Sequence, residues 1–149
     1  MAIQLFDDNY FMKQALNEAN TAFDKDEIPI GAVIVQNNQI IARAHNLTET
    51  LNDVTAHAEM QAFTAAADYI GGKYLTDCTL FVTLEPCAMC AGAAYWTQIT
   101  KVVYGAKDKK RGLLSTKQAH IFHPKTKIVG GVMEDDCIDL LQLFFKEKR

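Results

Sequence analysis

The sequence lacks most of the features that mark secreted or membrane-bound proteins. Its 149 residues include only four cysteines and three prolines. The first ten residues contain two aspartates and no basic residue, unlike a secretory signal peptide. No apolar run approaches the roughly 20 residues of a membrane-spanning helix. We therefore expect a cytoplasmic protein without a membrane segment, in which the cysteines do not form a disulfide framework.

Linkers, internal repeats and low-complexity segments are also missing. A chain of this length is typical of one domain with one hydrophobic core. Apolar residues make up 49% and charged residues 22%, which is ordinary for a soluble globular protein. We therefore predict a single domain over residues 1–149.

The charge is unevenly distributed along the chain. The net charge is −3, yet residues 101–149 contain 11 of the 15 lysines and arginines. Residues 1–100 contain 12 of the 18 acidic residues. Such asymmetry fits either an anion-binding face or a lysine-rich solvated surface, and composition alone leaves both open.

Hydrophobic periodicity predicts alternating helices and strands. Strands alternating with helices imply an α/β fold whose sheet is covered on both faces. No clear prediction emerges for residues 107–124. Helices are expected over 8–23, 55–70, 86–96 and 135–146, and strands over 30–35, 39–44, 79–84, 101–105 and 127–132.

Two short motifs offer the donors of a metal site. Cys87 and Cys90 are three residues apart, so both thiols lie on one face of a helix that Pro86 is expected to open. His57 and Glu59 are placed at the start of another predicted helix, where both side chains could reach the same ion. Structural zinc sites usually have four protein ligands, whereas catalytic sites have three and a water. We predict that His57, Cys87 and Cys90 bind one zinc ion and that Glu59 carries protons for its water.

Other interpretations of these residues remain. A Cys-x-x-Cys pair alone is also typical of thiol redox proteins. A structural zinc site would need a fourth ligand, for which His45, His120 and His123 are the candidates. Glu85 could replace Glu59 as the acid and base, although a role in shaping the corner before Pro86 is favoured.

The pairing of His57-Ala58-Glu59 with Pro86-Cys87-Ala88-Met89-Cys90 is the known signature of zinc deaminases. On these residues the sequence resembles the cytidine-deaminase-like superfamily over nearly its whole length. Leu84 to Cys90, together with Gly105-Ala106-x-Asp108, resembles the branch that acts on tRNA. The resemblance implies a three-layer α/β/α fold with a central mixed sheet of about five strands, and a homodimer.

The resemblance also implies a reaction and a substrate site. The reaction is hydrolysis of the wobble adenosine in a tRNA anticodon loop to inosine. Asn46 corresponds to the side chain that hydrogen-bonds the purine edge, and Asp108 to a contact with the anticodon backbone. Pro29, Ile30 and Ala58 fall where the family walls the base pocket.

Two stretches depart from the tRNA branch. Lys109 to Leu114 replaces a stretch that is usually glycine-rich, and Ala94-Tyr95-Trp96 resembles deaminases of free guanine. Deamination of a free nucleobase or nucleoside, of the guanine or cytosine type, is therefore the alternative function.

Overall fold

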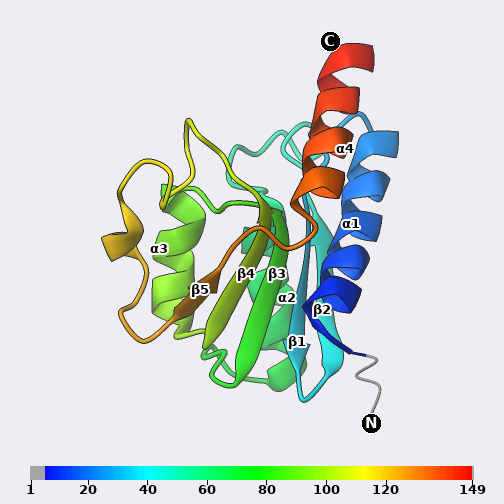
Figure 1. The fold of residues 1–149 in the computed structure, drawn as a ribbon. Coiled ribbons are helices and arrows are strands. Elements are labelled where there is room, and N and C mark those ends of the chain that lie inside the picture. Colours follow the sequence, from blue (N-terminus) through cyan, green and yellow to red (C-terminus); the bar gives the residue numbers. More distant parts are fainter. Residues whose placement is uncertain (1–5, 149) are drawn as a thin grey trace, which may run out of the picture.

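The computed structural model describes residues 6–148 as a five-stranded sheet with helices on both faces (Figure 1). The strand order is β2-β1-β3-β4-β5. Strand β1 pairs antiparallel with β2 and β3, and β3-β4-β5 are parallel. The elements in chain order are α1 (Asp8–Asp24), β1 (Gly31–Gln36), β2 (Gln39–His45), α2 (Ala58–Ile70), β3 (Cys78–Leu84), α3 (Ala88–Thr97), β4 (Lys101–Ala106), the 3-10 helix η1 (Ala119–Ile121), β5 (Lys127–Val129) and α4 (Glu134–Glu147).

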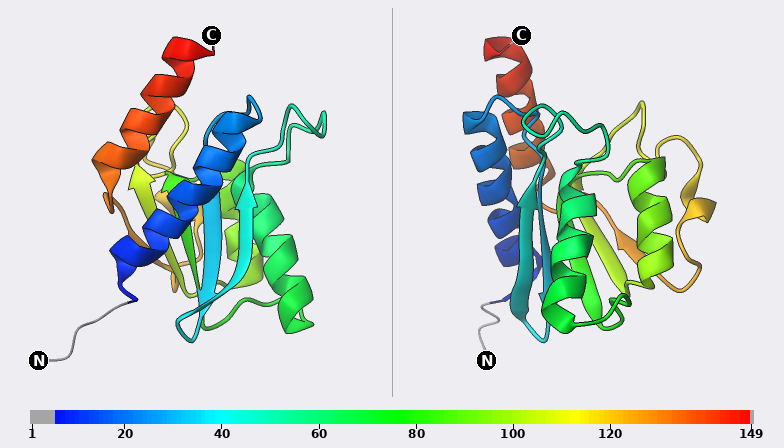
Figure 2. Two further views of the ribbon diagram at one scale, coloured as in Figure 1. Left: turned by 90° about the vertical axis from the view of Figure 1, so that its right-hand side faces the viewer. Right: turned by 180° about the vertical axis from the view of Figure 1, so that it is seen from behind.

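The helices form two outer layers, which confirms the predicted three-layer α/β/α architecture and mixed sheet. Helices α1 and α4 lie on one face of the sheet, and α2 and α3 lie on the other (Figure 2). Two apolar clusters fill the interfaces. One includes Met12, Val33 and Phe81 below α1, and the other includes Ala62, Leu80 and Val102 below α2 and α3.

Helix α1 lies very close to β1 because the strand begins at Gly31. A Cβ atom at this position would overlap the backbone of Ala15 and Ala19 in α1. The missing side chain therefore sets the distance between this helix and the sheet. Pro29 and Ile30, two of the predicted pocket-wall residues, come directly before this closely packed position.

Both central helices begin later than the sequence predicts. Helix α2 begins at Ala58 rather than at residue 55, because the Asp53 carboxylate accepts hydrogen bonds from the N–H and hydroxyl of Thr55 and holds that residue in a turn. Helix α3 begins at Ala88 rather than at Pro86, whose carbonyl accepts a hydrogen bond from Leu113. The prediction that Pro86 occupies the first turn of the helix is therefore wrong, and His57 and Cys87 become N-caps.

The last strand is also shorter than predicted, ending at Val129 rather than at residue 132. Gly130 and Gly131 follow, and the positive φ of 84° at Gly131 turns the chain away from the sheet. The stretch without a clear prediction, 107–124, consists of successive turns and the short helix η1. Within residues 6–148, no helix is both long and apolar enough to span a membrane.

Candidate zinc-dependent active site

The predicted metal ligands meet at one edge of the sheet. Strand β3 runs towards this edge and leads into α3, while the antiparallel β1 begins there at Gly31 and β2 ends there at His45. The loop after β2 leads to α2, so the first turns of α2 and α3 share this edge (Figure 2, right). His57 and Cys87 occupy the N-cap positions of the two helices, and Cys90 lies one turn into α3.

The three donor atoms have the spacing that a single zinc ion requires. His57 Nδ1 lies 3.7 Å from Cys87 Sγ and 3.4 Å from Cys90 Sγ, and all three atoms lie within 4.8 Å of one another. Zinc bonds of about 2.3 Å to sulfur and about 2.0 Å to nitrogen, at tetrahedral angles, separate such donors by roughly 3.6 Å. The donor set therefore fits zinc, and we conclude that these residues form the zinc-binding site.

The thiols differ in their readiness to lose a proton. A hydrogen bond with Cys90 lowers the pKa of the Cys87 thiol to about 3, with a further contribution from His57 and against the opposing effect of burial. The same hydrogen bond, together with burial, raises the pKa of Cys90. A hydrogen bond with Cys87 raises the pKa of His57. Zinc binds thiolates and neutral imidazole, so metal binding is coupled to proton release from this cluster.

Glu59 lies in the first turn of α2 and is 4% exposed. Burial raises the pKa of its carboxyl, against a smaller lowering by His57 and Cys90. Glu59 lies two residues after the ligand His57 and is not one of the three donors that fit the ion. A raised pKa makes a carboxyl a better proton donor, which suits a group that must both accept and release protons.

None of the three candidates for a fourth protein ligand, His45, His120 and His123, belongs to the metal-ligand cluster of the described residues. His45 Nε2 lies 3.0 Å from Lys25 Nζ, and its Nδ1 lies 3.3 Å from Glu18. His123 Nδ1 accepts a hydrogen bond from the backbone of Lys125. Among the described residues the potential metal cluster contains three residues and no fourth donor. All four cysteines are free, so Cys87 and Cys90 form no disulfide in this structure.

Four of the five predicted substrate residues lie at the same edge of the sheet as the ligands. Ala58 separates His57 from Glu59 and is buried, as is Pro29. The backbone N–H of Asn46 donates to the carbonyl of Ile30, and its side-chain amide donates to the carbonyl of Ile28 at 3.4 Å. Asn46 Oδ1 is the only buried side-chain polar atom without a partner among residues 6–148. A buried acceptor that lacks a donor is expected to bind a ligand or water.

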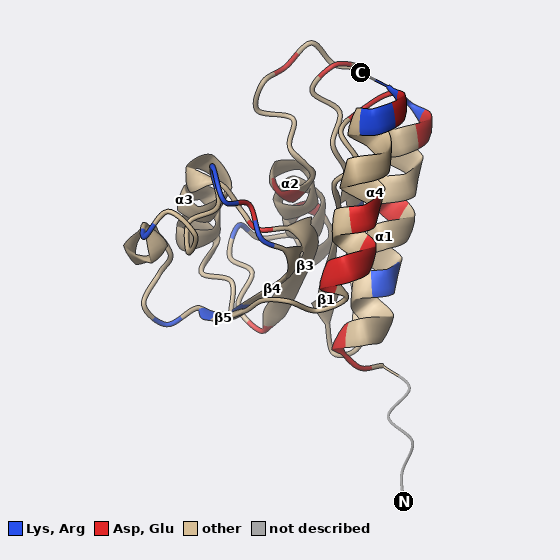
Figure 3. Ribbon diagram, turned by 45° about the horizontal axis from the view of Figure 1, so that its top comes forward, with Lys and Arg blue, Asp and Glu red and all other residues tan. Residues whose placement is uncertain are grey.

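The fifth predicted substrate residue, Asp108, follows β4 on the other side of the cluster. Its Oδ1 accepts hydrogen bonds from the backbone of Lys110 and Arg111 and closes a turn. The backbone N–H of Leu113 donates to the carbonyl of Pro86, which places the loop that carries this turn beside the residue before Cys87. Figure 3 shows the basic residues of the turn apart from the acidic residues on α1 and α4.

Sequence reasoning missed Glu27, which is 0% exposed. Its carboxylate accepts hydrogen bonds from the backbone N–H groups of Glu49 and Thr50 and holds the loop between β2 and α2. Its partners lie more than 20 residues away, so no local pattern could identify it. Glu85, the rival candidate to Glu59, is likewise buried and accepts hydrogen bonds from the loop after β4.

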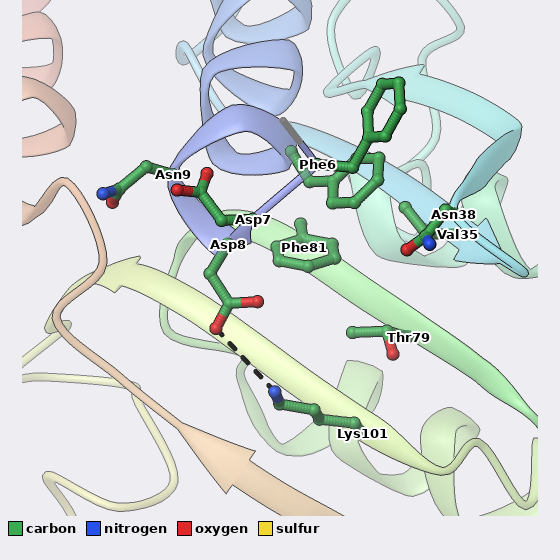
Figure 4. Close-up of a pocket in the computed structure, with 10 residues that line it drawn as sticks. Phe6, Asp7, Asp8, Asn9, Val35, Asn38, Thr79, Phe81 and Lys101 are labelled. Carbon is green, nitrogen blue, oxygen red and sulfur yellow. Dashed lines mark ion pairs between the residues drawn. The ribbon is translucent and has the colours of Figure 1, made fainter. Parts of the chain in front are cut away.

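A hollow of about 500 Å³ lies elsewhere, where the first turn of α1 crosses β3 and β4 (Figure 4). Phe6 and Phe81 provide its apolar wall, and Asp8 pairs with Lys101 across it at 3.7 Å. None of the zinc ligands or predicted substrate residues lines it.

The fold and the three-donor site with its buried carboxyl define a zinc-dependent deaminase. The cytidine and deoxycytidylate deaminase zinc-binding region matches residues 6–106, and the chain belongs to this family. A tRNA-specific adenosine deaminase from Bacillus subtilis is 47% identical over 146 residues, covering 95% of this chain and 91% of the relative.

Two solved structures bear on the substrate. One, from a study of A-to-I editing by tRNA:A34 deaminases at the wobble position, has a TM-score of 0.82 and 39% identity, covering 88% of this chain and 98% of that chain. A guanine deaminase from Bacillus subtilis has a TM-score of 0.63 and 38% identity, covering 75% of this chain and 69% of that chain.

Proposed function

We propose that this chain is a zinc-dependent tRNA adenosine deaminase that converts the wobble adenosine of an anticodon to inosine. The observation that carries this proposal is the full-length similarity to tRNA-specific adenosine deaminases, combined with an intact zinc site. The similarity to guanine deaminase covers less of both chains and keeps free guanine as the second candidate substrate.

The residues present match the needs of hydrolytic deamination. When bound, zinc supplies a Lewis acid that makes a water molecule a better nucleophile at neutral pH. Glu59 would accept a proton from water and donate protons to the ring nitrogen and the departing amine. Overall, the water oxygen bonds to C6, the C6–N bond to the amino group breaks, and ammonia leaves.

The substrate pocket is assigned to the residues beside the ligands. Asn46 Oδ1 is proposed to accept a hydrogen bond from the base, which would give this buried atom a partner. Pro29, Ile30 and Ala58 would wall the base, and Asp108 would contact the anticodon backbone. A loop nucleotide enters such a pocket at lower cost than a paired one, because it gives up less stacking.

The partners follow from the same proposal. Negatively charged RNA would lie over the exposed basic residues of the loop after β4, namely Lys107, Lys109, Lys110 and Arg111. We also propose a cytoplasmic homodimer that uses the layer formed by α2 and α3. Both helices expose large apolar side chains, Tyr69 and Ile70 on α2 and Tyr95 and Trp96 on α3, and exposed apolar patches commonly mark interaction surfaces.

The test uses the purified chain, an anticodon stem-loop with adenosine at the wobble position, and free guanine. We expect about one zinc per chain, inosine in the stem-loop, and no ammonia from guanine. The same stem-loop with guanosine at the wobble position is the matched control. Activity on the stem-loop should fall steeply with added salt, because phosphate contacts release counterions. Ammonia from guanine with an unchanged stem-loop would instead support the second candidate.

A further inference from the structure

Glu85 is a buried carboxylate that the proposed reaction does not use. It follows β3 directly, is 3% exposed, and lies two residues before the zinc ligand Cys87. Both of its oxygens are occupied. Oε1 accepts from the Asp108 N–H at 3.1 Å and the Ser115 hydroxyl at 2.6 Å, while Oε2 accepts from the N–H groups of Leu114 and Ser115 at 2.7 and 2.9 Å. A carboxylate with four donors has no lone pair directed at a reacting water, which argues against Glu85 as the acid and base.

The donors all belong to one loop, which we call the basic loop, residues 107–117. It has no strand ladder to fix its shape, and most of its backbone hydrogen bonds are local turns, such as Gly112 to Asp108 and Thr116 to Gly112. Leu113 anchors it in the core, and the Leu113 N–H donates to the carbonyl of Pro86. Five basic side chains on this loop are exposed: Lys107, Lys109, Lys110, Arg111 and Lys117.

Gly112 shows how closely the basic loop encloses the carboxylate. A Cβ atom at this position would overlap the Glu85 carboxylate itself. The loop therefore wraps around one charged acceptor, and that acceptor sits on the same corner as Cys87. A hydrogen bond to a charged group is stronger than one between neutral groups, so this contact is well suited to order a loop without secondary structure.

We propose that Glu85 is a positioning residue that holds the basic loop in the shape that receives the phosphates of the RNA. The inference rests on the proposed function, and it explains how the protein holds its phosphate-binding surface in shape. Glu85 fixes the N–H of Asp108 directly, and Asp108 in turn closes the turn that carries Lys110 and Arg111. Because the backbone of the loop is pre-organised in this way, RNA binding does not have to order it, and only the side chains lose freedom.

The experiment compares the zinc-loaded wild type with Glu85→Gln. Gln keeps the shape but replaces one acceptor oxygen with an NH2 group that faces N–H donors. We expect the KM for the anticodon stem-loop to rise by about ten- to a hundredfold, with kcat and zinc content nearly unchanged. The dependence of log KM on log salt should become shallower, by about 0.7 for each RNA phosphate that the variant no longer neutralises.

Limited trypsin digestion gives a readout that is independent of activity. The basic loop contains five lysine or arginine sites, and these should be cut faster in Glu85→Gln than in wild type. Glu27→Gln is the matched control, because it also removes a buried carboxylate that anchors a loop, but that loop is the one after β2. It should leave cleavage within residues 107–117 unchanged.

The outcomes separate this inference from the proposed function. A wild-type chain that leaves the stem-loop unmodified contradicts the proposed function before any variant is tested. With an active wild type, Glu85→Gln with unchanged KM, salt dependence and trypsin cleavage overturns the inference. Loss of zinc with a lower kcat at constant KM also overturns it, because Glu85 would then act through the metal site.

If Glu85→Gln does not fold, two variants of the basic loop test the same inference. Gly112→Ala pushes a methyl group against the carboxylate, and Ser115→Ala removes one of its four donors. Both should raise KM and trypsin cleavage while keeping zinc, with the smaller effect in Ser115→Ala. Wild-type KM and cleavage in both variants would overturn the inference.

Discussion

Glu27 gives the sharpest stability prediction, because its environment is fully described. It is 0% exposed, and its carboxylate accepts hydrogen bonds from Glu49 N–H at 3.0 Å and Thr50 N–H at 2.6 Å. These bonds join the segment before β1 to the loop that leads from Asn46 to His57. Glu27→Gln keeps the side-chain volume but removes the charge and turns one acceptor into a donor.

The magnitude follows from the hydrogen bonds affected. A hydrogen bond to a charged group contributes roughly 1.5–3 kcal/mol, and a buried donor left unpaired costs a similar amount. We therefore expect Glu27→Gln to lower the free energy of unfolding by about 2–3 kcal/mol at pH 7. The exposed Glu49→Gln is the control, and its effect should stay within about 0.5 kcal/mol.

The effect should depend on pH in a defined direction. Hydrogen bonds from Thr50 and Glu49 lower the pKa of Glu27 against the opposing effect of burial. A group whose pKa is lowered by folding stabilises the protein above its unfolded pKa, which is about 4.3 for Glu, and this stabilisation is lost as the pH falls through the folded pKa. The difference between wild type and Glu27→Gln should therefore be constant near neutral pH and shrink below about pH 4.5.

Urea unfolding followed by circular dichroism at several pH values measures this difference. Because both proteins share every other titrating group, subtracting their unfolding free energies isolates Glu27. A Glu27→Gln protein as stable as wild type at pH 7 would refute the reasoning. So would a deficit that stays constant down to pH 3.

Three further changes probe other parts of the molecule. Glu59→Gln should keep about one zinc per chain but lower kcat by about 10²–10⁴-fold, and retained turnover in a single-turnover assay would contradict its proposed role. Gly31→Ala should lower the free energy of unfolding by at least about 1–3 kcal/mol, because its methyl group would overlap the backbone of α1. Thermal unfolding measures this loss, and an unchanged melting temperature would show that the helix can shift freely. Trp96→Lys should shift the sedimentation mass from dimer to monomer, and a monomeric wild type would rule out the proposed homodimer.

The zinc ligands and the layer order were predictable because both depend on local patterns. Apolar residues such as Met12 and Leu16 recur at helical spacing, and the run from Ile30 to Val35 predicts a strand. His57, Cys87 and Cys90 are short motifs whose chemistry is independent of the exact helix boundaries. The helix boundaries were harder to predict, because Thr55 can either cap a helix or join a turn. In this protein its N–H and hydroxyl donate to the Asp53 carboxylate, which holds it in a turn.

The basic loop could not be predicted, because distant contacts determine its shape. Glu85 and its donors are separated by 23 to 30 residues, and no periodic pattern joins them. The unpartnered Oδ1 of Asn46 is equally invisible in the sequence, where Asn46 is also compatible with an ordinary turn. The roles of Glu59, Asn46 and Asp108 stay predictions until the variants are measured.

The placement of His57 and Cys87 at two helix starts has a consequence for the metal-free protein. Neither residue forms a side-chain hydrogen bond with its helix, so both first turns lack the usual cap. A metal held by both residues would join the beginnings of α2 and α3 and serve them as a shared cap. Chelation should therefore speed amide exchange at both helix starts together, and added zinc should slow both again.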